Sequence, residues 1–134
     1  MRISGKEYNK AAHARLLEAE ILRKNEKYHT SIYLLGYVLE CILGYLYCAR
    51  NGATYLDEVK GYDSNIWYDH AKLTEKFQVL GLYNEFRSEI DKFRTAWSVE
   101  MRYQSNNFIG KEESAQDIID AAIYIFKKIK SRTA

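Results

Sequence analysis

The segment 32–49, IYLLGYVLECILGYLYCA, is apolar except for one glutamate, Glu40. Its apolar residues occupy every face of a helix, and a helix that is apolar all round is buried all round. Its length is borderline for a membrane span, and a charge at its middle is costly in lipid. We therefore predict a buried core helix over about residues 30–50 and no membrane association.

Helical spacing continues through the rest of the chain, which contains no proline, a residue that β-rich folds use at turns and edges. Ser4 and Glu7 have the spacing of a capping box at the start of a first helix that ends near residues 24–27. Apolar steps of three and four predict a short helix over 73–80, then helices over 82–97 and about 112–130. Residues 51–68 and 103–110 lack this period and are expected to be loops. The prediction is all-α: an up-and-down bundle of four long helices plus one short helix, in one domain spanning 1–134.

Charge and motif content exclude several classes of protein. Twenty Lys and Arg against 18 Asp and Glu give a net charge of +2, unlike a strongly basic nucleic-acid-binding domain. The N-terminal residues contain no apolar signal core. Cys41 and Cys48 would lie about 10 Å apart along one helix, too far for a disulfide, so a cytoplasmic protein with reduced thiols is expected. No metal-ligand spacing, phosphate-binding glycine loop or nucleophile motif is present, so we predict no metal and no cofactor.

Glu40 is the first candidate for a functional residue. A buried carboxylate needs a cation, a cluster of hydroxyls or a water-filled cleft. Tyr33 and Tyr37 share its helix face and could supply hydroxyls, and Arg102 or Arg94 could supply charge. A structural pairing and a functional site both fit this pattern, because both perturb carboxylates.

The segment 94–103, RTAWSVEMRY, is the second candidate. Arg94 and Arg102 offer planar forks for phosphate, and Trp97 and Tyr103 offer rings on which a base can stack. Alternatively, Trp97 ends the core stripe of the fourth helix and the arginines form surface ion pairs. His70, at the start of the third helix, either caps that helix or lines the same cleft.

The order of these segments resembles the HEPN family of small prokaryotic helical-bundle proteins, over about residues 8–130. DHAKL is similar to the His-x-Leu segment of that family, and MRY to its Arg-Tyr element, with Gln104 where a proline often follows. Glu40 falls where many members have a glutamate in the second helix. The resemblance implies a helical bundle that binds nucleotide or RNA.

Ribonucleases of this family use an arginine followed four to six residues later by a histidine near the final helix. Here no histidine follows Arg102, and Arg23 with His29, at the end of the first helix, is the only formal match. The resemblance is therefore to the non-nuclease branch, whose members are often encoded beside a nucleotidyltransferase in a toxin-antitoxin or defence pair. We assign no catalytic residue, and a non-enzyme is favoured.

Three functional hypotheses follow. In the first, a homodimeric protein binds a nucleotide or RNA end through Arg102, Tyr103 or Trp97, with Glu40 and His70 shaping the cleft, and acts with a partner. In the second, the tyrosine-rich faces bind a protein and no small ligand exists. The third is a weak ribonuclease that uses Arg102, Tyr103 and Glu40. The homodimer is predicted because a helix apolar on every face suits a bundle plus a partner subunit, with Gly36 and Gly44 allowing close approach.

Overall fold

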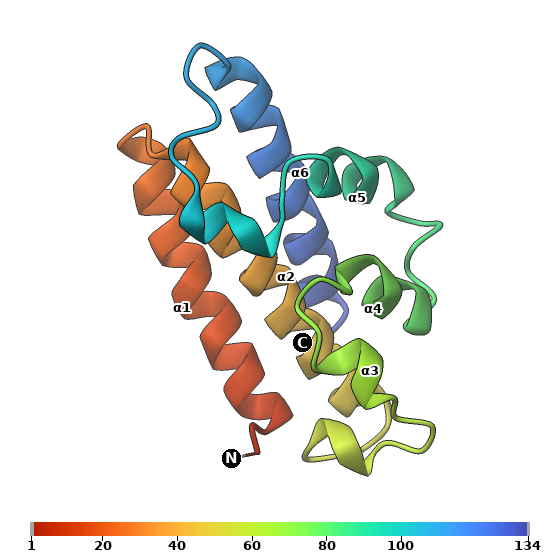
Figure 1. Cartoon of the computed structure of the whole chain (residues 1–134). Coiled ribbons are helices and arrows are strands. Elements are labelled where there is room, and N and C mark those ends of the chain that lie inside the picture. Colours follow the sequence, from red (N-terminus) through yellow and green to blue (C-terminus); the bar gives the residue numbers. More distant parts are fainter. Residues whose placement is uncertain (1, 134) are drawn as a thin grey trace.

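A computed structural model describes residues 2–133, and this part of the chain is all-α (Figure 1). Three helices are long: α1 (Gly5–Lys24), α2 (Tyr28–Arg50) and α6 (Glu112–Ser131). Three are short: α3 (Ser64–Trp67), α4 (Leu73–Val79) and α5 (Arg87–Arg94). Two 3₁₀ helices complete the order, η1 (Leu56–Glu58) and η2 (Val99–Tyr103).

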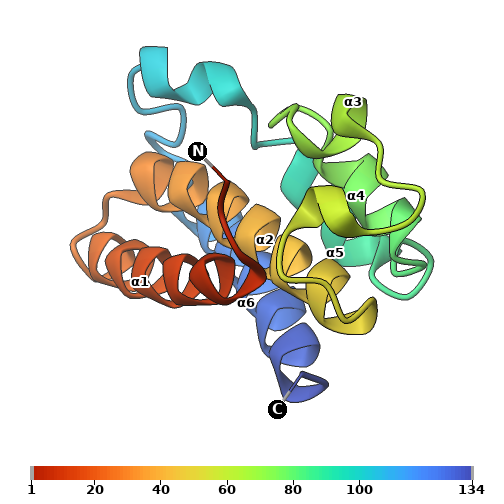
Figure 2. The same cartoon turned by 90° about the horizontal axis from the view of Figure 1, so that it is seen from below.

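α2 is the central element of the bundle. α1 and α6 both pack against it, and it also contacts α4, η1 and η2. The short helices α3, α4 and α5 lie on the side of α2 away from α1 (Figures 1 and 2). They carry the chain back along α2 between the end of α2 and the start of α6. Glu40 of α2, His70 in the turn before α4 and Arg102 of η2 are thereby brought to one side of the molecule.

The start of α1 confirms the predicted capping box. The backbone N–H of Glu7 donates to the Ser4 hydroxyl at 3.1 Å, and the Ser4 N–H donates to the Glu7 carboxylate at 3.0 Å. Ala12 and Ala19 face α2 and are fully buried, so small side chains let the two helices pack closely. Ser31 of α2 donates its hydroxyl hydrogen bond to the Ala19 carbonyl at 2.8 Å, which links the two helices.

α2 supplies much of the apolar core, which includes residues that are 0% exposed: Ile32, Leu35, Val38, Ile42 and Leu43. Among the described residues it is the one helix long and apolar enough to cross a bilayer, and 61% of its most apolar window is buried inside the protein. The core helix of a soluble protein has the same length and composition. The absence of a membrane association therefore stays a prediction.

The fourth predicted helix is much shorter than expected. Leu82 and Trp97, the ends of the predicted stripe, are both buried, but the continuous helix covers only Arg87–Arg94. Single helical turns flank it, closed by hydrogen bonds from the N–H of Phe86 to Leu82 and from the N–H of Trp97 to Phe93. The apolar spacing still identifies the buried residues correctly, because single helical turns place side chains on one face just as a continuous helix does. The expected set of four long helices plus one short helix is not what the structure has.

The predicted loop 51–68 contains both η1 and α3. Trp67, at the end of α3, is buried and stacks on Tyr47 of α2 with ring centroids 4.5 Å apart. The side chain of Asp63 caps α3 by accepting from the N–H of Asn65 at 2.9 Å. At the other end of the segment, the Glu58 carboxylate accepts from the N–H groups of Thr54 and Tyr55 at the start of η1. Side-chain caps and an aromatic contact therefore help to order a segment in which no helical period is visible.

The two glycines of α2 are approached by side chains of the same chain. Gly36 lies against the indole of Trp97, and Gly44 lies against the ring of Tyr8. Side chains of the same chain thus cover the two glycines that were expected to allow close approach of a second subunit. The homodimer stays a prediction, because these faces of α2 leave no exposed surface that would require a partner.

Candidate functional site

Three of the candidate residues, His70, Arg102 and Tyr103, line one open pocket of about 720 Å³ between the turn before α4, α2 and η2. Its lining includes four aromatic or imidazole rings, those of Tyr37, Tyr68, His70 and Tyr103. Arg102 and Glu100 come from η2, and Ser64, Asn65 and Asp69 come from α3 and the turn after it. The pocket therefore combines aromatic surface with the guanidinium of Arg102 and several polar groups.

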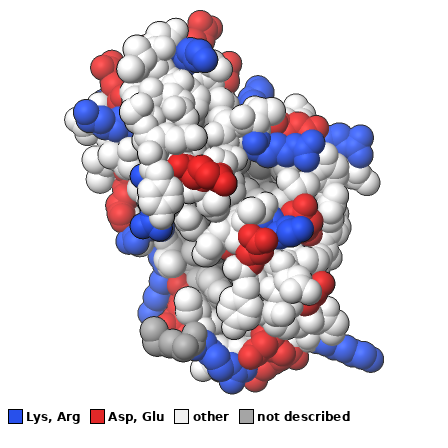
Figure 3. All heavy atoms as spheres, in the orientation of Figure 1, with Lys and Arg blue, Asp and Glu red and all other residues white. Residues whose placement is uncertain are grey.

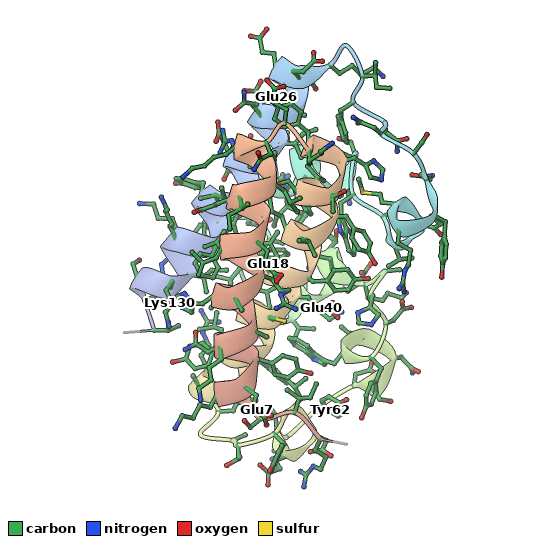
Figure 4. The ribbon with its side chains drawn as sticks, turned by 90° about the vertical axis from the view of Figure 1, so that its left-hand side faces the viewer. Glu7, Glu18, Glu26, Glu40, Tyr62 and Lys130 are labelled. Atoms are coloured by element: carbon green, nitrogen blue, oxygen red, sulfur yellow. The ribbon has the colours of Figure 1, made fainter. Side chains whose placement is uncertain are left out.

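Glu40 lies midway along α2, as Figure 4 shows, and its partner His70 lines the pocket. Its carboxylate contacts His70 through both oxygens, at 2.9 and 2.8 Å from Nδ1. Oε1 also lies 3.5 Å from Nζ of Lys76. The Glu40 side chain is only 13% exposed, so its charge is met by these two groups and not by bulk water.

Lys76 is the buried cation that the carboxylate requires. Its side chain is 1% exposed, and Nζ donates a hydrogen bond to the Asp69 carbonyl at 2.8 Å. Desolvation lowers the pKa of Lys76 from its usual range, and the nearby negative charge of Glu40 opposes that change. The expectation that Arg102 or Arg94 neutralises Glu40 is therefore wrong, because α4, and not η2 or α5, reaches the carboxylate.

Tyr37 and Tyr33 form a second layer beside the Glu40 and His70 pair. The Tyr37 ring contacts the His70 ring edge-on, with centroids 5.4 Å apart. The two tyrosine hydroxyls lie 3.1 Å from each other and not on Glu40. Burial raises the pKa of Tyr37, as does the hydrogen bond with Tyr33, and the positive charge of Arg102 opposes the rise. The tyrosines thus frame the carboxylate without hydrogen bonding to it.

Arg102 and Tyr103 lie at the mouth of the pocket. The guanidinium of Arg102 lies over the Tyr103 ring, 5.5 Å from its centroid. Within residues 2–133 it is in no ion pair. Tyr103 is 83% exposed, and Tyr68 on the opposite element is 76% exposed. A cation and exposed rings at one mouth are the groups that bind phosphate and base.

His29 of α2 holds η2 and the loop after it in place through two hydrogen bonds. Its Nε2 lies 2.8 Å from the carbonyl oxygen of Met101, and the backbone N–H of Asn107 donates to its Nδ1 at 3.3 Å. These contacts assign the proton to Nε2, because one ring nitrogen must donate and the other accept. Since Arg102 follows Met101 directly, His29 of α2 anchors the backbone from which the Arg102 side chain projects.

Trp97 and Arg94 belong to other surroundings. Trp97 is buried and donates its indole hydrogen bond to the Tyr33 carbonyl at 3.0 Å, so it closes the core stripe and presents no open face for a base. Arg94 pairs with Asp91 at 3.3 Å. Both line a smaller neighbouring cavity of about 350 Å³ and not the main pocket.

Sequence reasoning missed Lys76 and His29. Lys76 had a visible signal: with Leu73, Phe77 and Leu80 it occupies the i, i+3, i+4, i+7 positions of one helix face, where an inward lysine is unusual. His29 lies one position before the predicted helix and has no such pattern. Its role depends on contacts with Met101 and Asn107, which lie 72 and 78 residues further along the chain.

The chemistry of the pocket is that of binding polar and anionic groups. No cluster of three metal-ligating side chains occurs in the described part of the chain. Figure 3 shows acidic and basic side chains interspersed over one face, with no large patch of a single sign. Long-range attraction of a polyanion is thus weak, and the groups that could bind an anion locally at this pocket are the guanidinium of Arg102 and the imidazole of His70.

Comparison with known proteins gives no relative: no family model, curated protein or solved structure matches this chain.

Proposed function

We propose that this chain is an HEPN-like, homodimeric cytoplasmic protein that binds a nucleotide or an RNA end. It would act with a partner, such as a nucleotidyltransferase of a toxin-antitoxin or defence pair, and would not catalyse alone. The observation that carries the proposal is the position of Arg102, which has no ion-pair partner among residues 2–133 and lies over Tyr103 at the mouth of a 720 Å³ pocket. In this arrangement Arg102 binds phosphate and Tyr103 stacks on a base.

Calorimetry with a panel of nucleotides and short RNAs tests this proposal. Arg102→Gln should weaken binding about tenfold or more, since charge-assisted hydrogen bonds contribute about 1.5–3 kcal/mol. Arg87→Gln is the matched control, because the Arg87 guanidinium also lies over a tyrosine ring, that of Tyr83 at 5.3 Å, but away from the pocket. Absence of binding to every member of the panel would refute the proposal.

A protein-interaction module is the second candidate, and the exposed aromatic rim favours it. Tyr68 and Tyr103 are mostly exposed, as is Ile109 at 78%. Exposed large side chains of this kind occur in protein interfaces as well as in stacking sites. Two observations together would favour this candidate. A nucleotidyltransferase would co-purify with the chain, and no nucleotide would change the melting temperature of the chain alone.

A further inference from the structure

Two nitrogen groups of different chemistry, the guanidinium of Arg102 and the imidazole of His70, border the same pocket. We propose that together they select a terminal phosphate monoester, the group that ends a nucleotide or an RNA strand, over a phosphate diester. This inference rests on the proposed function, because it specifies which phosphate the site takes.

The orientation of His70 is the first step. Its Nδ1 is engaged by both oxygens of Glu40, at 2.9 and 2.8 Å. The His70 side chain is 57% exposed and lines the pocket, and in the described structure no group hydrogen-bonds to its Nε2. Because Nδ1 is held by the carboxylate, Nε2 is the atom that His70 presents to a ligand.

The support beneath His70 is rigid. Glu40 is 13% exposed and Lys76 1% exposed, and Nζ of Lys76 is anchored on the Asp69 carbonyl at 2.8 Å. A ligand in the pocket therefore meets the imidazole and not the carboxylate. Glu40 is a positioning residue, acting on the ligand through His70.

Arg102 borders the same pocket from another element. His70 comes from the turn before α4 and Arg102 from η2, and Tyr37 of α2 lines the pocket with them. The His70 ring packs against the Tyr37 ring, with centroids 5.4 Å apart. A phosphate bound in this pocket therefore has the guanidinium and Nε2 as its two nitrogen partners.

The chemistry of this pair distinguishes a monoester from a diester. A monoester takes up its second proton at about pH 6, in the range where imidazoles titrate. When the monoester binds, a proton taken up by either group is shared between Nε2 and a phosphate oxygen. A diester carries one negative charge and no such proton, so it satisfies Arg102 but leaves Nε2 with a weaker partner.

Four other charged groups surround His70. Glu40 on α2 and Lys76 on α4 contact each other and form the support beneath it. Asp69, before His70 in the chain, and Glu100, on η2 with Arg102, also line the pocket. These two carboxylates repel a long polyanion, but they also repel a doubly charged monoester more than a diester, so the preference for a monoester comes from His70 and Arg102 and not from these groups.

Calorimetry on the full chain at pH 7 tests the selection with three probes: adenosine 5′-monophosphate, its methyl diester and adenosine. We expect the monophosphate to bind about tenfold more tightly than the methyl diester. His70→Gln should reduce that ratio to about one. His13→Gln is the control, because His13 lies on α1 outside the pocket and should leave the ratio unchanged.

The role of Glu40 needs a readout that general stability does not alter. The monophosphate-to-diester ratio is therefore measured from pH 5.5 to 8 in the wild type and in Glu40→Gln, with melting curves to check folding. In the wild type we expect the ratio to depend on pH, and in Glu40→Gln we expect that dependence to flatten. If the ratio depends on pH in the same way in both proteins, Glu40 is not a positioning residue of this site.

RNA trinucleotides with a 5′-phosphate, a 3′-phosphate or neither distinguish a strand end from a free nucleotide. Tighter binding of one phosphorylated trinucleotide than of the monophosphate identifies that RNA end as the ligand, and the reverse order identifies the nucleotide. Equal binding of monophosphate and methyl diester by the wild type would overturn this inference and leave the proposed function intact. Absence of binding to every probe would overturn both.

Discussion

At position 36 the backbone of α2 lies directly against the indole ring of Trp97. A Cβ atom added to Gly36 would fall 1.9 Å from Nε1 of Trp97, whereas one added to Gly44 would fall 3.3 Å from the nearest atom of Tyr8. Only the first distance is impossible without movement. The same indole donates to the Tyr33 carbonyl, so its movement would also break a buried hydrogen bond.

Gly36→Ala should therefore lower the free energy of unfolding by about 2–3 kcal/mol, the usual cost of overpacking plus a broken buried hydrogen bond. Urea denaturation followed by circular dichroism measures this change. Gly44→Ala is the matched control in the same helix. Its effect should stay within about 1 kcal/mol, because the gain in helix propensity offsets a mild contact. Equal effects of the two substitutions would contradict the assigned packing of Trp97.

The sequence shows that Glu40 needs a partner but does not show which residue that partner is. Glu40 could be identified as a residue that needs a partner, because it is the only Asp, Glu, Lys or Arg in the apolar segment 32–49. The identity of that partner could not, since Lys76, Arg94 and Arg102 are all cations on later segments whose path relative to Glu40 the sequence does not give. Only the path of the short helices decides which of them reaches the carboxylate.

At the scale of elements, η2 depends on contacts from outside itself. It has no side-chain cap at its start, and Met101 is its one buried residue. His29 of α2 binds the Met101 carbonyl and the Asn107 N–H, thereby holding both η2 and the loop that follows it. The backbone that carries Arg102 is thus anchored by a residue on another helix.

His29→Ala should destabilise the protein by about 2 kcal/mol, because it leaves the buried Met101 carbonyl and the part-buried Asn107 N–H without partners. Amide exchange measured by mass spectrometry should show the largest loss of protection over residues 99–108. The control is His13→Ala: His13 contacts the edge of Phe126 with ring centroids 5.4 Å apart, and its removal should cost less than about 1 kcal/mol. A uniform change in exchange across the chain would contradict a local role for His29.

The helical elements show where periodicity is a sufficient guide. α1, α2, α4 and α6 lie where capping residues and apolar steps predict them. The stripe over 82–97 predicts the correct buried residues but not the helix length, since turns and a short helix bury the same side chains. η2 and α3 have no period, and tertiary contacts of Met101 and Trp67 order them.

At the scale of the whole molecule, burial of ionisable side chains makes stability depend on alkaline pH. Desolvation raises the pKa of Cys41 from its ordinary 9.0 to about 12, with a further contribution from Glu40, and raises that of Tyr8 from 10.0 to about 12. The folded chain keeps these protons at pH values where the unfolded chain loses them. Stability therefore falls as pH rises above 9 for the thiol and above 10 for the phenol.

Between pH 8 and pH 10, Cys41 should account for a loss of about 1.4 kcal/mol in the free energy of unfolding. Urea denaturation of the wild type and of Cys41→Ala at pH 8, 9 and 10 measures it. The variant should be less stable at pH 8 but should lose less stability on going to pH 10. Parallel losses in the two proteins would contradict this prediction, because they would show that the pKa of the Cys41 thiol is the same in the folded and the unfolded chain.

By itself the sequence determined that the chain is all-α, where its long helices lie, and that Glu40 needs a partner. These features depend on local periodicity, capping and the cost of burying a charge, which operate within a few turns of helix. The tertiary structure decided that Lys76 and His70 meet Glu40, that Trp97 belongs to the core, and that Arg102 and Tyr103 share a pocket with His70. Those contacts join α2 to segments 30 or more residues away, and their geometry depends on how short, weakly periodic helices pack against it.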